Sequence, residues 1–215
     1  DLSTDYDEIK ATLSKDEILK EATEFGSGIR ILNQDPFETI ISFIISANNQ
    51  IPRIRKSIEI IAKEYGDFIE NYNGIDYYSF PTAEKLSKVD VLDLREKARV
   101  GFRDKRIIDT SIMIANNEID IEGIFSLSKD EGKEKLMELP GVGPKVSDCI
   151  LLFAYDKSDA FPVDVWVKRV MEYFYLKEET SLKNISKQGD LLFKDLAGYA
   201  QQYLFYYARE LDIGK

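Results

Sequence analysis

The sequence predicts an all-α protein, built as one compact domain or as two small lobes. Apolar residues recur at helical spacing along most of the 215 residues, and residues that start helices, such as Asp35-Pro36, precede these runs. A hydrophobic share of 44% is enough for a buried core at this length. The predicted class therefore rests on periodicity, helix-start signals and core size together.

The first four predicted helices follow from their apolar spacing. They cover, in chain order, residues 9–13, 18–22, 36–46 and 52–61. The first two each present one apolar stripe and are separated by a capping Ser14. The third is apolar on most sides, so we expect it to be a central buried helix. Residues 48–50 interrupt the pattern before Pro52 starts the fourth helix.

The later elements are bounded by caps, prolines and glycines. Residues 73–81 are expected to form a loop in which residues 75–80 favour a short β-segment. Thr82 and Asp164 are expected to cap helices, and Gly101 separates two others. The remaining predicted helices cover residues 83–86, 91–97, 105–116, 128–139, 145–155, 165–176 and 190–209.

The composition excludes several kinds of catalytic site. The chain has no histidine, which rules out Ser-His-Asp hydrolysis, Cys-His proteolysis and histidine-ligated metals. Cys149 is the single cysteine, so disulfides within the chain, four-cysteine zinc sites and cysteine-ligated iron–sulfur clusters are excluded. We therefore expect no metal and no cofactor. No segment approaches the roughly 18 apolar residues of a membrane span, so no membrane partner is expected.

The net charge and the local charge clusters give opposite indications about a nucleic-acid partner. With 29 Lys and Arg against 39 Asp and Glu, the net charge of −10 disfavours a polyanionic partner. The acids concentrate in residues 1–24, which carry eight acids and three lysines. Residues 95–106 carry six cations and two acids, and residues 53–63 carry four cations and one acid. Two local basic clusters therefore remain available to a nucleic acid, although an exposed helix face explains each equally well.

The segment 136–150 reads as helix, Leu-Pro-Gly-Val-Gly turn, then helix. Gly141 and Gly143 permit positive φ and a close backbone approach. The amides of this turn, including that of Val142, and of the next helix N-terminus can cradle a DNA phosphate. The alternative is a plain turn between two helices with a glycine C-cap.

Lys145 lies in the first turn of the second helix of this hairpin. The positive end of the helix dipole disfavours an ammonium there, and nucleophilic attack requires the neutral amine. A surface lysine that contacts phosphate is the alternative. Cys149 lies four residues later on the same face, where its sulfur fits either the wall of a base pocket or the core.

Asp164 follows Lys145 by 19 residues and is expected to cap the helix 165–176. Capping amides stabilise the ionised carboxylate. An ionised carboxylate near an amine can stabilise an oxocarbenium-like sugar and orient the nucleophile. A cap with no further role is the alternative.

These motifs together resemble the helix–hairpin–helix glycine/proline/aspartate DNA glycosylases. The resemblance is carried by Leu-Pro-Gly-Val-Gly-Pro-Lys-Val-Ser-Asp-Cys at 139–149 and Pro-Val-Asp-Val-Trp at 162–166. Asn-Asn-Gln-Ile-Pro-Arg at 48–53 and Gly-Phe-Arg at 101–103 resemble the bacterial type of the 8-oxoguanine DNA glycosylase/AP lyase branch. The resemblance implies two helical lobes, 1–32 with 142–215 and 33–141, with the helix–hairpin–helix at their junction and a cleft between them.

The resemblance also implies roles for individual residues. Lys145 would attack C1′ of the flipped nucleotide and form a Schiff base that permits β-elimination, with Asp164 stabilising the developing charge. Cys149 and Phe205 would sandwich the flipped base while Gln201 hydrogen-bonds its edge. The alternative places Phe205 in the core and Gln201 at the surface of a terminal helix.

A second group of residues is implied in reading the base opposite the lesion. Asn48, Arg53 and Arg103 match the positions that contact the orphaned cytosine, and Phe102 matches the wedge. Solvated charges are the alternative for the two arginines. The expected partner is duplex DNA containing an oxidised guanine opposite cytosine, bound by a monomer located in the cytoplasm, at the nucleoid of a bacterium.

Two departures from the family pattern are expected to matter. Trp166 stands where animal enzymes carry a histidine, and the family's N-terminal antiparallel β domain is expected to be absent. Two other functions remain open: a non-catalytic helix–hairpin–helix DNA-binding module, and a glycosylase of the same superfamily with another lesion specificity.

Overall fold

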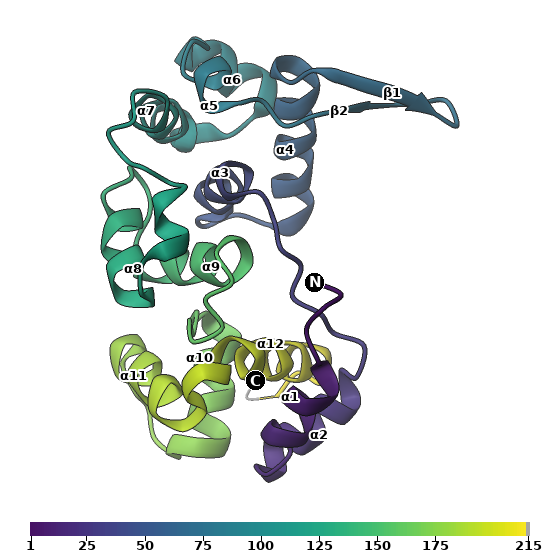
Figure 1. The fold of residues 1–215 in the computed structure, drawn as a ribbon, viewed down its shortest axis with the longest axis vertical. Helices are drawn as coiled ribbons and strands as arrows, with labels where there is room; N and C mark the ends of the chain where they lie inside the picture. The colour runs from purple at the N-terminus through teal and green to yellow at the C-terminus, as the bar shows by residue number, and fades with distance from the viewer. Residues whose placement is uncertain (214–215) are drawn as a thin grey trace. The chain divides into compact units, whose positions relative to one another are not determined.

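The computed structural model describes residues 1–213 as two compact helical units, so the all-α prediction is confirmed (Figure 1). The first unit contains Asp1–Asn33 and Leu151–Lys215, and the second contains Gln34–Ile150. Within the described residues, no helix is both long and apolar enough to cross a membrane. The two units are described separately below.

The second boundary between the units differs from the expected position. The sequence places it after residue 141, whereas it lies after Ile150, inside helix α9 (Pro144–Ala154). A part-buried ion pair from Lys133 of α8 (Lys129–Met137) to Asp148 at 2.7 Å links the first part of α9 to the second unit. Lys145 therefore belongs to the second unit, not to the unit that contains both chain ends.

The second unit is organised around helix α3, whose Ile40, Ile41, Ile44 and Ile45 are buried. This confirms the prediction of a central buried helix after Pro36. Helix α7 packs against α3, α5 and α6, and α4 packs against α3 and α6. The elements before α8 are α3 (Pro36–Ser46), α4 (Ile51–Tyr65), β1 (Phe68–Tyr72), β2 (Ile75–Tyr78), α5 (Ala83–Leu86), α6 (Val91–Ala98), η1 (Gly101–Arg103), α7 (Asp104–Ala115) and η2 (Gly123–Ser126).

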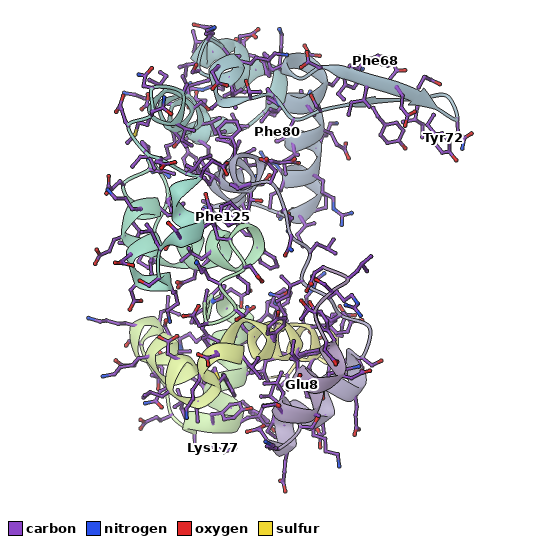
Figure 2. The ribbon with its side chains drawn as sticks, viewed as in Figure 1. Glu8, Phe68, Tyr72, Phe80, Phe125 and Lys177 are labelled. Carbon is purple, nitrogen blue, oxygen red and sulfur yellow. The ribbon has the colours of Figure 1, made fainter. Side chains whose placement is uncertain are left out.

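The strands β1 and β2 form an antiparallel hairpin that extends away from the helices of its unit (Figure 2). Asn73 and Gly74 form its two-residue turn, both with positive φ, as type I′ turns require. The expected β-segment after residue 75 is confirmed by β2. The sequence does not predict the first strand, because its residues, Phe-Ile-Glu-Asn-Tyr, do not alternate between apolar and polar.

The first unit packs its helices around α12 (Ala197–Glu210). This helix contacts α2 (Glu17–Phe25), α10 (Val165–Val170) and α11 (Leu182–Phe193). The remaining elements are α1 (Tyr6–Leu13), the π-helical turn η3 (Met171–Leu176) and the short turn η4 (Lys194–Leu196).

Two helix predictions in this unit are wrong. The expected helix 190–209 is two helices, because Lys194 adopts φ 48° and ψ −128° and stops α11. The N-cap of α2 is Asp16, which accepts the N–H of Leu19 at 2.9 Å, whereas Ser14 ends α1. Both errors come from local geometry that apolar spacing does not encode.

Candidate active site

The hairpin turn joins α8 to α9, and Gly141 is the residue that its geometry requires. Gly141 has φ +91°, and a Cβ there would lie 2.9 Å from Cδ of Arg106. A side chain at 141 would therefore be strained both by its backbone and by α7. Gly143 differs from the prediction, because its φ is not positive and an added Cβ would meet no described atom within 4 Å. The backbone at 143 faces open space.

Fewer backbone N–H groups of this turn are available to an anion than predicted. The N–H of Val142 donates to the carbonyl of Leu139 at 3.1 Å, and its side chain is buried. The Val142 amide therefore holds the turn together. The first amides of a helix have no partner within that helix, and Ser147 already donates to the Gly143 carbonyl at 2.9 Å. The donors for a phosphate are consequently those at the start of α9.

Lys145 is exposed at the second residue of α9. Its Nζ lies 5.5 Å from the centroid of the Phe43 ring on α3. This distance is within the range of a cation–π contact, which positions the amine over an aromatic face while leaving it accessible. An accessible, positioned amine satisfies the first geometric requirement of a nucleophile.

The acid beside Lys145 in the sequence is engaged elsewhere. Asp148 is 5% exposed and accepts two hydrogen bonds from Nζ of Lys133, at 2.7 and 2.8 Å. The sequence does not predict this pair, because the partners are 15 positions apart and the hairpin turn lies between them. Cys149 is buried one turn beyond Lys145 on the same helix. Burial fits both the base-pocket and the core interpretation, so its role stays a prediction.

Arg103 is buried, 5% exposed, and supports the loop that contains Asn48. Its Nε donates to the Ala47 carbonyl at 2.9 Å, and its Nη2 donates to the same carbonyl and to that of Asn48 at 3.0 Å. Its Nη1 donates to Val100 at 3.1 Å. Burial lowers the pKa of Arg103. Most of its guanidinium donors bind backbone carbonyls, and its contact with the opposite cytosine stays a prediction.

Phe102 and Asn48 are exposed residues next to the buried Arg103. Phe102 is 57% exposed, with Cζ of Arg103 at 4.3 Å and Cζ of Arg106 at 5.5 Å from its ring centroid. An exposed ring held by two guanidinium groups has the rigidity that a wedge between bases needs. Asn48 is exposed in a left-handed conformation with φ +51°.

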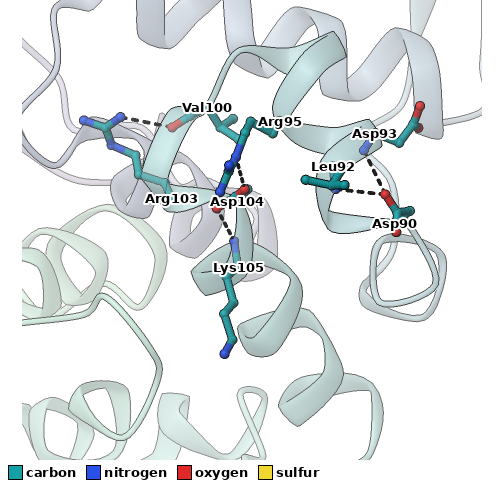
Figure 3. A network of polar contacts seen from close by, with 8 residues as sticks. All are labelled: Asp90, Leu92, Asp93, Arg95, Val100, Arg103, Asp104 and Lys105. Atoms are coloured by element: carbon teal, nitrogen blue, oxygen red, sulfur yellow. Dashed lines mark hydrogen bonds and ion pairs between the residues drawn. The ribbon is translucent and has the colours of Figure 1, made fainter.

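The start of α7 is fixed by a polar network directly after Phe102 and Arg103 (Figure 3). Asp104 is 1% exposed and accepts from Nε of Arg95 at 2.5 Å and from the Lys105 N–H at 2.7 Å. Burial alone raises the pKa of Asp104, but these donors outweigh it and lower the pKa. The carboxylate therefore remains ionised and holds η1 against α6.

Arg53 is exposed in the first turn of α4, in the second unit. Three other predicted residues lie in the first unit: Asp164, Gln201 and Phe205. Asp164 caps α10 by accepting the N–H of Val167 at 2.8 Å, which confirms the predicted cap. Helix α10 packs against α12, which carries Gln201 and Phe205 one turn apart. Gln201 is buried and its Oε1 accepts from Gln202 at 2.6 Å, while Phe205 is half-buried. The core-and-surface alternative is therefore wrong for Gln201.

No group of three His, Cys, Asp or Glu side chains that could hold a metal ion occurs among residues 1–213. The chemistry available in the described units therefore consists of an accessible lysine, a capping carboxylate and backbone amides.

A family model of HhH-GPD superfamily base excision DNA repair proteins matches residues 41–194. The chain belongs to this superfamily. The match includes the hairpin, Lys145 and Asp164.

Relatives of known function place the chain within one branch of the HhH-GPD superfamily. A probable N-glycosylase/DNA lyase of Methanothermobacter thermautotrophicus is 35% identical over 92% of this chain and 69% of that protein. An N-glycosylase/DNA lyase of Saccharomyces cerevisiae is 37% identical over 83% of this chain, but only 56% of the yeast protein is matched. The chain therefore spans little more than half of the yeast relative.

A crystal structure gives the same placement. Clostridium acetobutylicum 8-oxoguanine glycosylase/lyase, in complex with dsDNA containing cytosine opposite 8-oxoG, is 51% identical. The two structures share a TM-score of 0.95, and the match covers 99% of this chain and 73% of that chain. The predicted resemblance to the 8-oxoguanine glycosylase branch of HhH-GPD proteins is confirmed.

The N-terminal segment shows more of the family than the sequence predicts. The model of the 8-oxoguanine DNA glycosylase N-terminal domain matches residues 1–40. In this chain the matched segment contains α1, α2 and the first turn of α3, and strands among residues 1–213 occur only in the β1–β2 hairpin. The expectation that this domain is absent therefore needs correction, since a helical part of it is recognisable.

Proposed function

We propose that this chain excises 8-oxoguanine from duplex DNA and then cleaves the DNA strand as an AP lyase. The observation that carries the proposal is the exposed amine of Lys145 at the start of α9, directly after the turn that Gly141 shapes. A phosphate bound at the first amides of α9 would hold the DNA strand next to this amine. Duplex DNA with an oxidised guanine is the proposed partner.

The proposed chemistry begins with attack by Nζ of Lys145 on C1′ of the damaged nucleotide. The bond from C1′ to the base breaks, and the base leaves with the electron pair and takes up a proton. The sugar ring opens as the amine loses its protons, which gives a Schiff base between lysine and C1′. Loss of a proton from C2′ then expels the 3′ phosphate by β-elimination.

Asp164 is proposed to stabilise the positive charge that develops on the sugar. Its carboxylate is held in place by the N–H of Val167, which donates to it at 2.8 Å, and a fixed carboxylate can stabilise an oxocarbenium-like transition state. Cys149, Gln201 and Phe205 are proposed to form the pocket for the flipped base. Asn48 and Arg53 are proposed to read the opposite cytosine, with Arg103 positioning the Asn48 loop.

Borohydride trapping tests the nucleophile. Reduction of the Schiff base should give a covalent complex between the wild-type chain and duplex DNA containing 8-oxoguanine opposite cytosine. Lys145→Gln should lower the yield of this complex by at least a hundredfold. Lys135→Gln, which removes an exposed lysine at the end of α8, is the matched control and should trap like the wild type.

Three results would contradict the proposal. Trapping by Lys145→Gln at the wild-type level would show that another amine attacks. No adduct with the wild type, together with equal affinity for damaged and undamaged duplex, would favour a non-catalytic DNA-binding module. An adduct with a different damaged base but none with 8-oxoguanine would indicate another lesion specificity.

A further inference from the structure

The second unit contains a hollow of about 370 Å³ between α4 and the end of α6. It brings together the two basic clusters, 53–63 and 95–106, which are far apart in the sequence. Figure 1 shows α4 and α6 beside one another in this unit, and the two helices are in contact. The lining residues are Arg53, Lys56, Ser57, Ile60, Ala98 and Arg99.

Helix geometry explains why this face of α4 lines the hollow. Its four lining residues follow the i, i+3, i+4, i+7 spacing of a single face. Ser57 and Ala98 are buried, whereas Arg53, Lys56 and Arg99 are exposed. The hollow therefore combines small, buried lining residues with three exposed cations.

Arg99 holds an unusual conformation at the end of α6. It has φ 55° and ψ 34°, in the left-handed region, and its N–H donates to the Arg95 carbonyl at 3.1 Å. This conformation ends the helix and is uncommon for a long side chain. It directs the chain so that Arg99 lines the hollow with the α4 cations.

The charge of the hollow is not neutralised by acids of the described chain. Its lining contains three cations and no Asp or Glu. By contrast, the neighbouring cations of α6 are paired, since Arg95 contacts Asp104 at 2.5 Å and Lys97 contacts Asp93 at 3.0 Å. A concave site with three unneutralised cations favours an anion that can accept hydrogen bonds from both a planar guanidinium and an ammonium.

The hollow also lies next to the loop proposed to read the opposite base. Arg53 is in the first turn of α4, and its N–H donates to the Gln50 carbonyl at 3.0 Å, in the segment that follows Asn48. A DNA strand that presents its base to Asn48 has its backbone phosphates within a few ångströms of that base. The anion nearest to this hollow is therefore a phosphodiester.

We propose that this hollow binds one backbone phosphate of the DNA strand opposite the lesion, through Lys56 and Arg99. The inference rests on the proposed function, because it requires a duplex with its undamaged strand at the Asn48 loop. The contact is made to phosphate oxygens and is independent of base sequence. It gives the acidic chain a second contact with DNA, in addition to the one proposed at the start of α9.

The first test is the salt dependence of DNA binding. Lys56→Gln combined with Arg99→Asn removes both cations, and asparagine tolerates the left-handed conformation. The control combines Arg55→Gln with Lys63→Gln, which removes two exposed cations of α4 that do not line the hollow. Thermal unfolding of both double variants verifies that they fold.

The probe is a duplex with a tetrahydrofuran abasic analogue opposite cytosine, because it is bound without being cleaved. Each neutralised phosphate contributes about 0.9 to the slope of log K against log salt. The hollow variant should lose about one unit of slope, which is roughly an eightfold rise in Kd at 0.1 M salt. A slope equal to that of the control variant overturns the proposal.

The second test identifies the phosphate. Single neutral methylphosphonates are placed at each position of both strands. On the undamaged strand, one position near the cytosine should weaken wild-type binding. At that position the hollow variant should lose no further affinity, because its contact is already gone. Coupling to a phosphate of the lesion strand, or to none, overturns the proposal; the latter would leave only a site for free phosphate.

The trapping reaction distinguishes this inference from the proposed function. The control variant should trap 8-oxoguanine duplex like the wild type, because both Lys145 and the hollow are intact. If the wild type traps but the hollow variant binds like the control, only the phosphate site is wrong. If the wild type does not trap at all, the proposed function itself fails.

Discussion

The starts of helices α9 and α10 carry the two proposed catalytic residues, and they are built in opposite ways. Asp164 caps α10 with its own carboxylate, which accepts the N–H of Val167 at 2.8 Å. Gly143 precedes α9 without any side chain, and no acid lies in its first turn. The start of α10 is therefore capped by a side chain, whereas Gly143 offers no capping side chain to the start of α9.

Because of this difference, the two helix starts suit different roles. At an internally capped start the carboxylate is fixed by a helix amide, which suits stabilisation of a cation on the substrate. An uncapped start with an exposed lysine suits binding of a phosphate and attack on the sugar next to it. The predictions below alter one start at a time.

The largest effect is expected for Asp164→Asn. Asparagine caps a helix about as well as aspartate, so the free energy of unfolding should change by less than about 1 kcal/mol. The lost negative charge should slow excision of 8-oxoguanine by roughly a hundredfold or more. Single-turnover kinetics measure the rate, and thermal unfolding measures the stability.

Ser181→Asn is the matched control for this variant. Ser181 caps α11 in the same unit, so the substitution exchanges one capping residue for another without a change of charge. It should leave the excision rate within about twofold of the wild type. An Asp164→Asn rate that is equally unaffected would leave Asp164 as a helix cap only.

A smaller effect on binding is expected when α9 receives a cap like that of α10. Gly143→Asp places a carboxylate at the uncapped start, where an added Cβ meets no described atom within 4 Å. The free energy of unfolding should rise by a few tenths of a kcal/mol. Affinity for duplex DNA should fall roughly tenfold, because the carboxylate occupies the amides and repels a phosphate.

Gly143→Asn separates charge from bulk in this experiment. Asparagine caps as well as aspartate and is nearly the same size, but it is neutral. Its Kd, measured by fluorescence anisotropy, should lie between those of the wild type and Gly143→Asp. Identical losses for the two variants would mean that side-chain volume, not anion binding, decides the effect.

Gly141→Ala should act mainly on stability. The alanine would adopt φ +91° and its Cβ would lie 2.9 Å from Cδ of Arg106, so the free energy of unfolding should fall by about 1–3 kcal/mol. Urea unfolding measures this loss. Gly143→Ala is the control, since that position has neither positive φ nor a close neighbour, and its loss should be under about 1 kcal/mol.

The comparison of the two glycines shows how far sequence reasoning reaches. The motif predicts the hairpin, the cap at Asp164 and the exposed lysine, because these depend on residues close together in the chain. It assigns the same conformation to Gly141 and Gly143, although only Gly141 packs against α7. Packing between distant segments decides that difference, and the sequence does not encode it locally.

The same limit applies to the charged residues. The basic clusters are visible in the sequence, but their members have different environments after folding. Arg103 is buried against three backbone carbonyls, Arg95 pairs with Asp104, and Arg99 lines an unneutralised hollow. Charge counts along the chain cannot separate these three arginines, because each environment is created by contacts with other elements.

A third helix start, that of α7, gives the last prediction. Asp104 there is buried and has a lowered pKa, because the donors from Arg95 and Lys105 outweigh the effect of burial. Its ionised form is favoured in the folded state, so its contribution to stability is complete above the ordinary pKa of aspartate. The contribution is lost as the pH falls from that value through the lowered pKa.

Asp104→Asn should therefore destabilise the chain near neutral pH, and the difference from the wild type should shrink below about pH 4. Denaturant unfolding across this range measures the difference. Asp90→Asn is the control, because Asp90 is an exposed N-cap of α6 that asparagine can replace. A difference for Asp104→Asn that is constant with pH would mean that its hydrogen bonds stabilise α7 without its charge. The start of α7 would then depend on the geometry of the Asp104 hydrogen bonds alone.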